Sequence, residues 1–111
     1  MINPKYQIFR DTDDGQFYYR LIDANGEIVL NSDGYFNKQS CLEDISSVRK
    51  NARFDSRFDR KDNFFCHAFK LKTDDDKTIG TSEHYVDTNS REQGIYSVKR
   101  DGITAPIEDL S

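Results

Sequence analysis

The chain has 111 residues and a net charge of −4, with 35% hydrophobic, 32% charged and 13% aromatic residues. A disordered chain would lack this share of aromatic residues, and a general nucleic-acid binder would normally carry a basic balance. We therefore expect a single folded domain, residues 1–111, with a thin core and a well-solvated surface.

The first half of the chain predicts three strands and a helix. YQIFRD and QFYYRLI alternate apolar and polar residues, which predicts two strands joined at the turn signal TDDG. The Asn25-Gly26 pair predicts a hairpin turn into a third strand, EIVLNS. Asn37 is the expected N-cap of a helix with one apolar face, formed by Cys41, Ile45, Val48 and Ala52.

The second half repeats the first at an offset of 50 residues. Residues 8–51 placed on residues 58–101 give identical pairs at Arg10/Arg60, Leu21/Leu71, Ser32/Ser82, Tyr35/Tyr85, Ser40/Ser90, Ile45/Ile95, Ser47/Ser97 and Val48/Val98. This repeat predicts strands at RFDSRFD, CHAFKLK and KTIGTS. Asp87 is the expected N-cap of the second helix.

The copies differ at two structurally informative places. Asp75-Asp76 replaces Asn25-Gly26, so we expect the second hairpin to have another turn type. Arg91 begins the apolar face of the second helix, and we expect its stem at the rim of the core with its head in water. Basic pairs in the last helical turns are expected to complement the helix dipoles: Arg49-Lys50 and Lys99-Arg100.

One unit of three strands and a helix has too little core for independent stability. Two units side by side would give one continuous sheet with both helices on one face, an α+β two-layer sandwich. We place repeat one at about residues 4–56 and repeat two at about residues 57–111.

The stretch FYYRLIDANGEIVLNSDGYFNKQSCLEDISSVRKNA resembles the repeat of the YegP-like family, a domain of unknown function. KTIGTSEHY, SREQGIYSVKRDG and TAPIEDL resemble the family's other repeat, so the likeness covers nearly the whole chain. The chain departs from the family pattern at Asp44, where the helix prefers Gly, at Asp75-Asp76, and in the longer linker RFDSRFDRKDN.

The resemblance implies two tandem β-β-β-α-β repeats in one mainly antiparallel sheet, with the C-terminal strands exchanged between the repeats. ARFDS would then be the strand after the first helix, and TAPIEDL the strand after the second. The family brings no established catalytic residue, ligand or partner.

Neither metal chemistry nor a cofactor is indicated by the residue pattern. Cys66 and His67 are neighbours on a strand, so their side chains diverge. The acidic runs DTDDG and TDDDK lack the spacing of an EF-hand loop and fall where hairpins turn. We expect no metal, no cofactor and no catalytic residues.

The face of the sheet away from the helices is the main candidate surface. If Phe17, Tyr19, Leu21, Phe69 and Leu71 face the helices, the opposite face carries the candidate ligand-binding residues Tyr18, Arg20, Lys70 and Lys72. The loops before the helices, Ser32 to Tyr35 and Ser82 to Tyr85, are a second candidate surface.

We therefore expect a non-catalytic binding or interaction module in the cytoplasm. Two cysteines are too few for a secreted disulfide scaffold, and no segment has the apolar length of a signal peptide or membrane span. The partner would be a protein, a peptide or a small anionic ligand rather than nucleic acid or membrane, and the protein a monomer or homodimer. The alternatives are a structural accessory domain and an enzyme with a site between the repeats, using His67 or His84 as acid or base.

Overall fold

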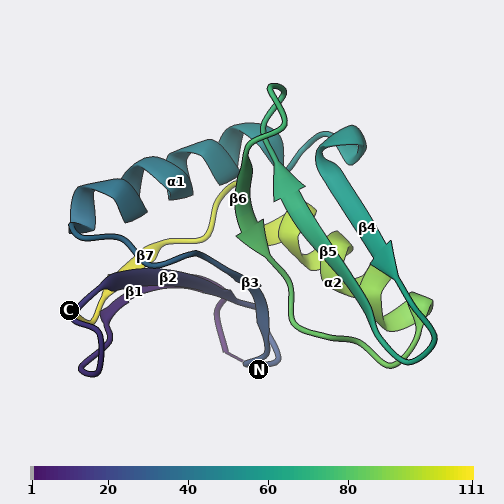
Figure 1. Ribbon diagram of the computed structural model, residues 1–111, viewed down its shortest axis with the longest axis horizontal. Helices are drawn as coiled ribbons and strands as arrows, with labels where there is room; N and C mark the ends of the chain where they lie inside the picture. Colours follow the sequence, from purple (N-terminus) through teal and green to yellow (C-terminus); the bar gives the residue numbers. More distant parts are fainter. Residues whose placement is uncertain (1) are drawn as a thin grey trace.

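The computed structural model describes residues 2–111, and its elements follow the duplicated order of the sequence (Figure 1). The first repeat contains β1 (Lys5–Arg10), β2 (Phe17–Ile22), β3 (Ile28–Asn31) and helix α1 (Lys38–Asn51). A 3-10 turn, η1 (Asp55–Arg57), leads into the second repeat. That repeat contains β4 (Phe58–Asp62), β5 (His67–Lys72), β6 (Thr78–Thr81), helix α2 (Thr88–Asp101) and β7 (Ile107–Asp109).

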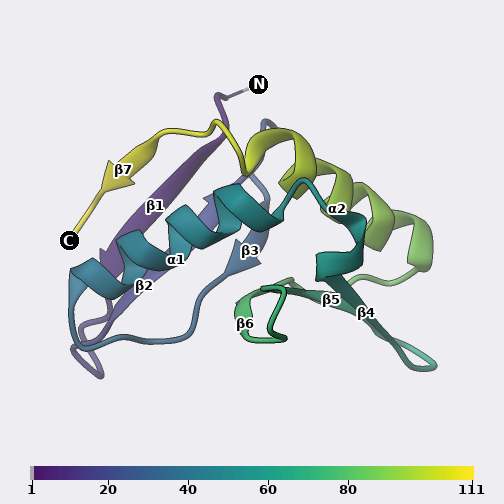
Figure 2. The same cartoon turned by 90° about the horizontal axis from the view of Figure 1, so that it is seen from above.

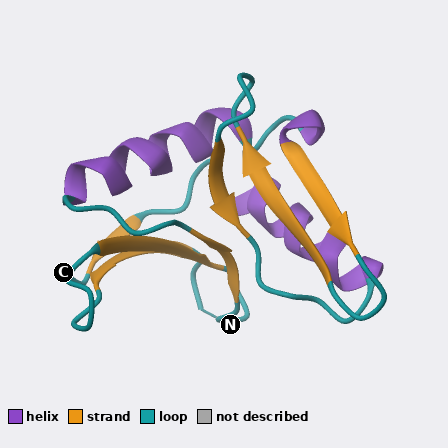
Figure 3. Cartoon of the chain, in the orientation of Figure 1, coloured by secondary structure: helices purple, strands orange, loops and turns teal. Residues whose placement is uncertain are grey.

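The strands form one twisted sheet in the order β4-β5-β6-β3-β2-β1-β7 (Figure 3). β7 pairs with β1 in parallel, and the other neighbouring strands are antiparallel. Helix α1 lies across β1 and β2, and α2 packs on β3 and β5 (Figure 2). The predicted α+β fold, a mainly antiparallel sheet with both helices on one face, is confirmed.

The strand after each helix pairs with the other repeat, but the first of these strands begins later than expected. Residues 52–56 contain no strand, so the assignment of ARFDS is wrong: a turn and η1 occupy this stretch, and β4 follows them. β4 pairs with β5, while β7 reaches back to β1. Because β4 is both the strand after α1 and the first strand of repeat two, the sheet has seven strands.

The expectation of a different second hairpin turn is also wrong. Gly26 and Asp76 both have a left-handed backbone, with φ of 80° and 69°. The two turns share the same hydrogen bond, from Gly26 N to Asp23 O (3.0 Å) and from Asp76 N to Thr73 O (3.1 Å). Asp is among the few residues with a side chain that tolerate this conformation in turns.

The helix faces predicted from the sequence form the core, with one correction at Arg91. Cys41, Ile45, Val48 and Ala52 are fully buried, and Asn37 and Asp87 cap the two helices as expected. The head of Arg91 does not lie in water, because the side chain is buried and its guanidinium binds the carboxylates of Asp62 and Glu92. Asp62, on β4, and Glu92, the next residue in the helix, thus neutralise the buried charge of Arg91.

The two repeats meet at β3 and β6, where Asn31 and Thr81 are the paired residues. Leu30 and Gly80 are equivalent positions of the duplication, and the Leu30 side chain fills the space above Gly80. A Cβ atom on residue 80 would lie 2.7 Å from Leu30 Cγ. The Tyr19 hydroxyl crosses the same joint and donates to Ile79 O (2.5 Å). Close approach of the repeats therefore requires a residue without a side chain at position 80.

A basic residue in the last turn of each helix binds the segment that follows the other helix. Arg49 of α1 donates to the carbonyl oxygens of Ile103 (2.9 Å) and Ala105 (2.7 Å). Its counterpart on α2, Lys99, binds Asp55 Oδ1 at 2.6 Å. These basic residues therefore join the repeats in addition to lying where helix dipoles favour positive charge.

We expect Gly80→Ala to destabilise the fold by about 1–3 kcal/mol, because the new methyl group overpacks the contact with Leu30. Urea unfolding measures the free energy. In the Leu30→Ala background the methyl group has room, so the same substitution should cost clearly less. Equal costs in both backgrounds would contradict the proposed contact.

Candidate functional site

Pairing across the sheet aligns seven polar residues on the face away from the helices. Directly paired residues of neighbouring strands project from the same face of a sheet. The register of each pair therefore gives one line of side chains, called here the polar row: Asp59, Lys70, Thr81, Asn31, Arg20, Gln7 and Glu108. Arg20 and Lys70 are equivalent positions of the two repeats and lie on either side of the joint.

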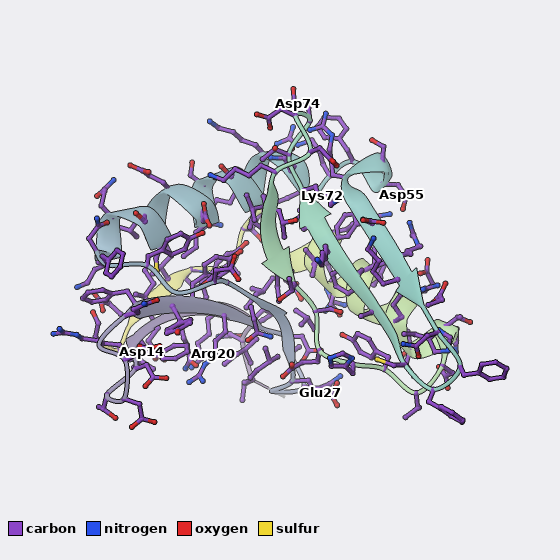
Figure 4. The ribbon with its side chains drawn as sticks, in the orientation of Figure 1. Asp14, Arg20, Glu27, Asp55, Lys72 and Asp74 are labelled. Atoms are coloured by element: carbon purple, nitrogen blue, oxygen red, sulfur yellow. The ribbon has the colours of Figure 1, made fainter. Side chains whose placement is uncertain are left out.

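Arg20 (Figure 4) and Tyr18 lie together on the β1–β2 half of this face, around the ring of Phe9. The Tyr18 ring stacks on Phe9 with centroids 5.7 Å apart, and the Arg20 guanidinium lies 4.5 Å from the Phe9 ring centroid. Arg20 Nε donates to Gln7 Oε1 (2.8 Å), and the Tyr18 hydroxyl donates to Asp14 Oδ2 (2.5 Å). An aromatic pair thus holds a cation at a fixed position.

Lys70 and Lys72 lie on β5, away from this cluster. Lys70 is exposed and makes no ion pair with residues 2–111. Lys72 binds Asp59 (3.2 Å) and Asp76 (3.3 Å), and it lines a hollow of about 550 Å³ with Asp74. The four predicted residues therefore share a face without converging on one point: Arg20 and Lys70 share the polar row, while Lys72 is held by carboxylates.

The loops before the helices are built in the same way in both repeats. Ser32 Oγ accepts from Tyr19 N (2.8 Å) and Ser82 Oγ accepts from Phe69 N (2.9 Å), so each serine extends the sheet by one hydrogen bond. The following tyrosines, Tyr35 and Tyr85, then bridge to the start of β2 and β5. The repeated Ser-acid-x-Tyr pattern is thus explained by architecture.

The two histidines lie at the second repeat's end of the sheet. His67 Nδ1 contacts Asp62 Oδ1 at 2.7 Å, whereas His84 Nδ1 contacts the Cys66 thiol. Cys66 and His67 therefore have different partners, and no group of metal-binding side chains occurs within residues 2–111. His84 lines a cavity of about 410 Å³ between the β2–β3 turn and α2, which sequence inspection did not identify.

Several contributors to these sites carry no signal in the sequence. Phe9 and Gln7 matter because β1 lies beside β2, and the inter-repeat cavity exists because a turn of one repeat meets a helix of the other. The replacement of Gly by Asp44 was visible as a departure from the family pattern, although its chemistry was not. None of the helices among the described residues is long and apolar enough to cross a membrane.

The fold and the polar row together define a tandem-repeat α+β protein with one uncovered sheet face. Residues 13–59 and 66–109 match the family described as Domain of unknown function (DUF1508), and the chain belongs to this family. It is similar to a UPF0339 protein in the ptx operon 5′ region of Stutzerimonas stutzeri, with 38% identity over 95% of each chain. YegP of Escherichia coli K12 is 37% identical over 86% of this chain and 88% of its own.

Two solution NMR structures share the fold. One is YegP from Escherichia coli, described as a protein of unknown function, with a TM-score of 0.88 and 32% identity over 99% of this chain and 95% of that chain. The other is a UPF0339 protein from Shewanella oneidensis, with a TM-score of 0.89 and 32% identity over 98% of this chain and 92% of that chain. The expected membership of the YegP-like family is confirmed, and the family's function is unknown.

The hydrogen bond to Asp14 raises the pKa of Tyr18 to about 12. Asp14→Ala removes the acceptor, so we expect the Tyr18 pKa to fall toward the ordinary tyrosine value of about 10. Ultraviolet absorbance at alkaline pH measures the change, and the Tyr18→Phe protein identifies which part of the signal belongs to Tyr18. A Tyr18 pKa that is the same with and without Asp14 would contradict this contact.

Proposed function

We propose that the protein is a non-catalytic binding module whose open sheet face binds an acidic peptide segment. The observation that supports this most is the separation of charge. The chain is net negative, yet the side chains that its described strands direct to the open face include more cations than carboxylates. The cations are Lys5, Arg20, Lys61, Lys70 and Lys72, and the carboxylates are Asp59 and Glu108.

The internal ion pairs leave two of these cations available. Asp59 contacts both Lys61 (3.0 Å) and Lys72 (3.2 Å), and Glu108 contacts Lys5 (3.6 Å). Arg20 contacts the neutral amide of Gln7 and the ring of Phe9, and neither Arg20 nor Lys70 has an acidic partner within the described chain. An external carboxylate at either position would therefore gain a cation without displacing an internal one.

The spacing of Arg20 and Lys70 favours an extended ligand. Three strand intervals separate them in the polar row, which corresponds to about 14 Å. Acidic residues four positions apart in an extended peptide are separated by about 13 Å and point to the same side. The Phe9–Tyr18 stack beside Arg20 offers an apolar contact for a flanking side chain.

The free cysteines support a cytoplasmic setting for this module. Neither cysteine forms a disulfide, and burial raises the pKa of the Cys41 thiol to about 11, which keeps this thiol unreactive. We propose the cytoplasm as its location on this basis.

We expect a fluorescein-labelled peptide with Glu at positions i and i+4 to bind the wild-type protein, as measured by fluorescence anisotropy. Arg20→Glu combined with Lys70→Glu should weaken binding by about tenfold or more, because both charge-assisted contacts become repulsive. Raising the salt concentration should also weaken it. In two-dimensional NMR spectra, the peptide should shift the signals of Tyr18, Arg20 and Lys70.

The matched control is Lys50→Glu with Arg53→Glu, which changes the net charge equally at exposed positions near the end of α1. This control should bind the peptide nearly as well as the wild type. Equal loss in both double variants would mean that only net charge matters, and absence of NMR shifts on the open face would rule out this surface.

A further inference from the structure

The cavity between the repeats has a counterpart elsewhere in the chain that is filled by the protein itself. The cavity is lined by Asp23 and Glu27 of the β2–β3 turn and by Tyr85, Gly94 and Ser97 of the second repeat. Shifted by 50 residues, the acidic positions become Thr73 and Lys77, and the helical glycine becomes Asp44. We call the cavity the open place, and the equivalent site around Asp44, Thr73 and Lys77 the filled place.

In the filled place, which is the counterpart of the cavity, the carboxylate of Asp44 occupies the space, and the positive charge of Lys77 acts on it. Asp44 is buried on α1 and accepts a hydrogen bond from the Tyr35 hydroxyl. Burial raises the pKa of Asp44, and the positive charge of Lys77 on the β5–β6 turn acts in the opposite direction. The charge of a turn residue of repeat two thus acts on a buried carboxylate on a helix of repeat one.

In the open place, the helical carboxylate is missing. Gly94 has no side chain, and a Cβ atom there would lie 2.3 Å from the hydroxyl oxygen of Tyr85. The Tyr85 ring stacks on Phe69. The Tyr85 hydroxyl has no hydrogen-bond partner within residues 2–111, and no side-chain polar atom among them is both fully buried and unpaired. This hydroxyl is therefore not fully buried, and Tyr85 lines the cavity.

The charge of the facing turn is also reversed. Glu27, labelled in Figure 4, stands where the counterpart has Lys77, and Asp23 stands where it has Thr73. Neither carboxylate forms an ion pair with the described residues, and Arg100, whose charge interacts with Asp23, is already bound to Asp101 at 2.8 Å. Asp23 accepts hydrogen bonds from the backbone N–H groups of Asn25 (2.9 Å) and Glu27 (3.0 Å), so the cavity combines an open volume, a hydroxyl without a partner and the Glu27 carboxylate, which forms no ion pair with the described residues.

We propose that this cavity binds a primary ammonium group on an alkyl chain, either in a free diamine or in a lysine side chain. The ammonium would donate to the Glu27 carboxylate and to the Tyr85 hydroxyl, which already occupies the space over Gly94, and the alkyl chain would lie along the part of the cavity lined by Ser90 and Gln93. The volume of about 410 Å³ accommodates a ligand of this size. This site lies on another part of the molecule from the polar row, so it stands independently of the proposed peptide binding.

Two probes test the proposal, cadaverine for the free diamine and N-acetyl-lysine amide for the side chain. NMR titration should shift the signals of Tyr85, Gly94 and Glu27 with either or both probes, and the dicarboxylate glutarate should cause no such shifts. Binding of cadaverine alone assigns the site to a free diamine, and binding of both assigns it to the ammonium group in general. Failure of both probes to shift these signals overturns the proposal.

Glu27→Lys should raise the dissociation constant of the bound probe by about tenfold or more, because an attractive charge becomes repulsive. Asp74→Lys is the matched control, since it changes the net charge equally at the opposite end of the molecule (Figure 4) and should leave binding unchanged. Equal losses in the two variants would show a general effect of net charge and overturn the site. Glu27→Gln, which keeps the shape of the side chain, gives the same comparison if the lysine variant does not fold.

Transferring the charges of Asp44 and Lys77 to the equivalent positions provides a test of stability that does not depend on the identity of the ligand. Gly94→Asp alone forces its Cβ atom against the Tyr85 hydroxyl and places a third carboxylate beside Asp23 and Glu27, so the midpoint of urea unfolding should fall. Gly94→Asp combined with Glu27→Lys places the charges of Asp44 and Lys77 at the equivalent positions, and the midpoint should recover in part, by the share of the loss that is due to charge repulsion, while the probe no longer binds. A double variant that is no more stable than Gly94→Asp would contradict the equivalence of the two places.

Discussion

The two repeats can share one sheet only because their equivalent positions at the joint are not occupied by equal side chains. Leu30 and Gly80 face each other across β3 and β6, and the leucine fills a space that belongs to both. Leucine at both positions would overfill this space, whereas glycine at both would leave it empty at the centre of the core. The paired residues Asn31 and Thr81 and the hydrogen bond from Tyr19 to Ile79 depend on this close approach.

A duplicated protein of this kind is therefore asymmetric at its centre, and the asymmetry extends outward. Tyr19 donates a hydrogen bond across the joint, while its counterpart Phe69 has no hydroxyl and can only pack. The pairs Asp44–Lys77 and Gly94–Glu27 continue the difference at the inter-repeat contacts. Strands, caps and helix faces are built from residues that are alike in the two repeats, whereas the inter-repeat cavity differs from its counterpart because Glu27 and Gly94 differ from Lys77 and Asp44.

Local patterns in the sequence were sufficient for much of this architecture. The alternation around Tyr19 and Phe69 correctly divided the sheet into a buried and an open face, and Asn37 and Asp87 were identified as caps because capping depends on a few neighbouring residues. Arg91 was misjudged because Asp62, one of the carboxylates that bind it, comes from a strand whose place follows from the whole fold.

The candidate sites were less accessible to sequence analysis for the same reason. Arg20 and Lys70 could be placed on one face, but their alignment in a single row follows from the pairing of β3 with β6. The cavity requires Glu27 and Gly94 to meet, and neither residue type suggests a site in its own neighbourhood. Contacts between the repeats depend on how the two halves pack against each other, and the spacing of apolar residues within one strand or helix does not predict this packing.

The pairing of β7 with β1 links the earliest strand of the chain to the last one. During synthesis, β1 leaves the ribosome nearly a hundred residues before β7. The native hydrogen bond from the Tyr6 hydroxyl to the Gly102 carbonyl therefore forms only after Gly102 has been synthesised. Arg49 similarly lacks its two carbonyl acceptors until the segment after α2 has been translated. The first repeat therefore cannot complete these native contacts before the segment after α2 has been synthesised.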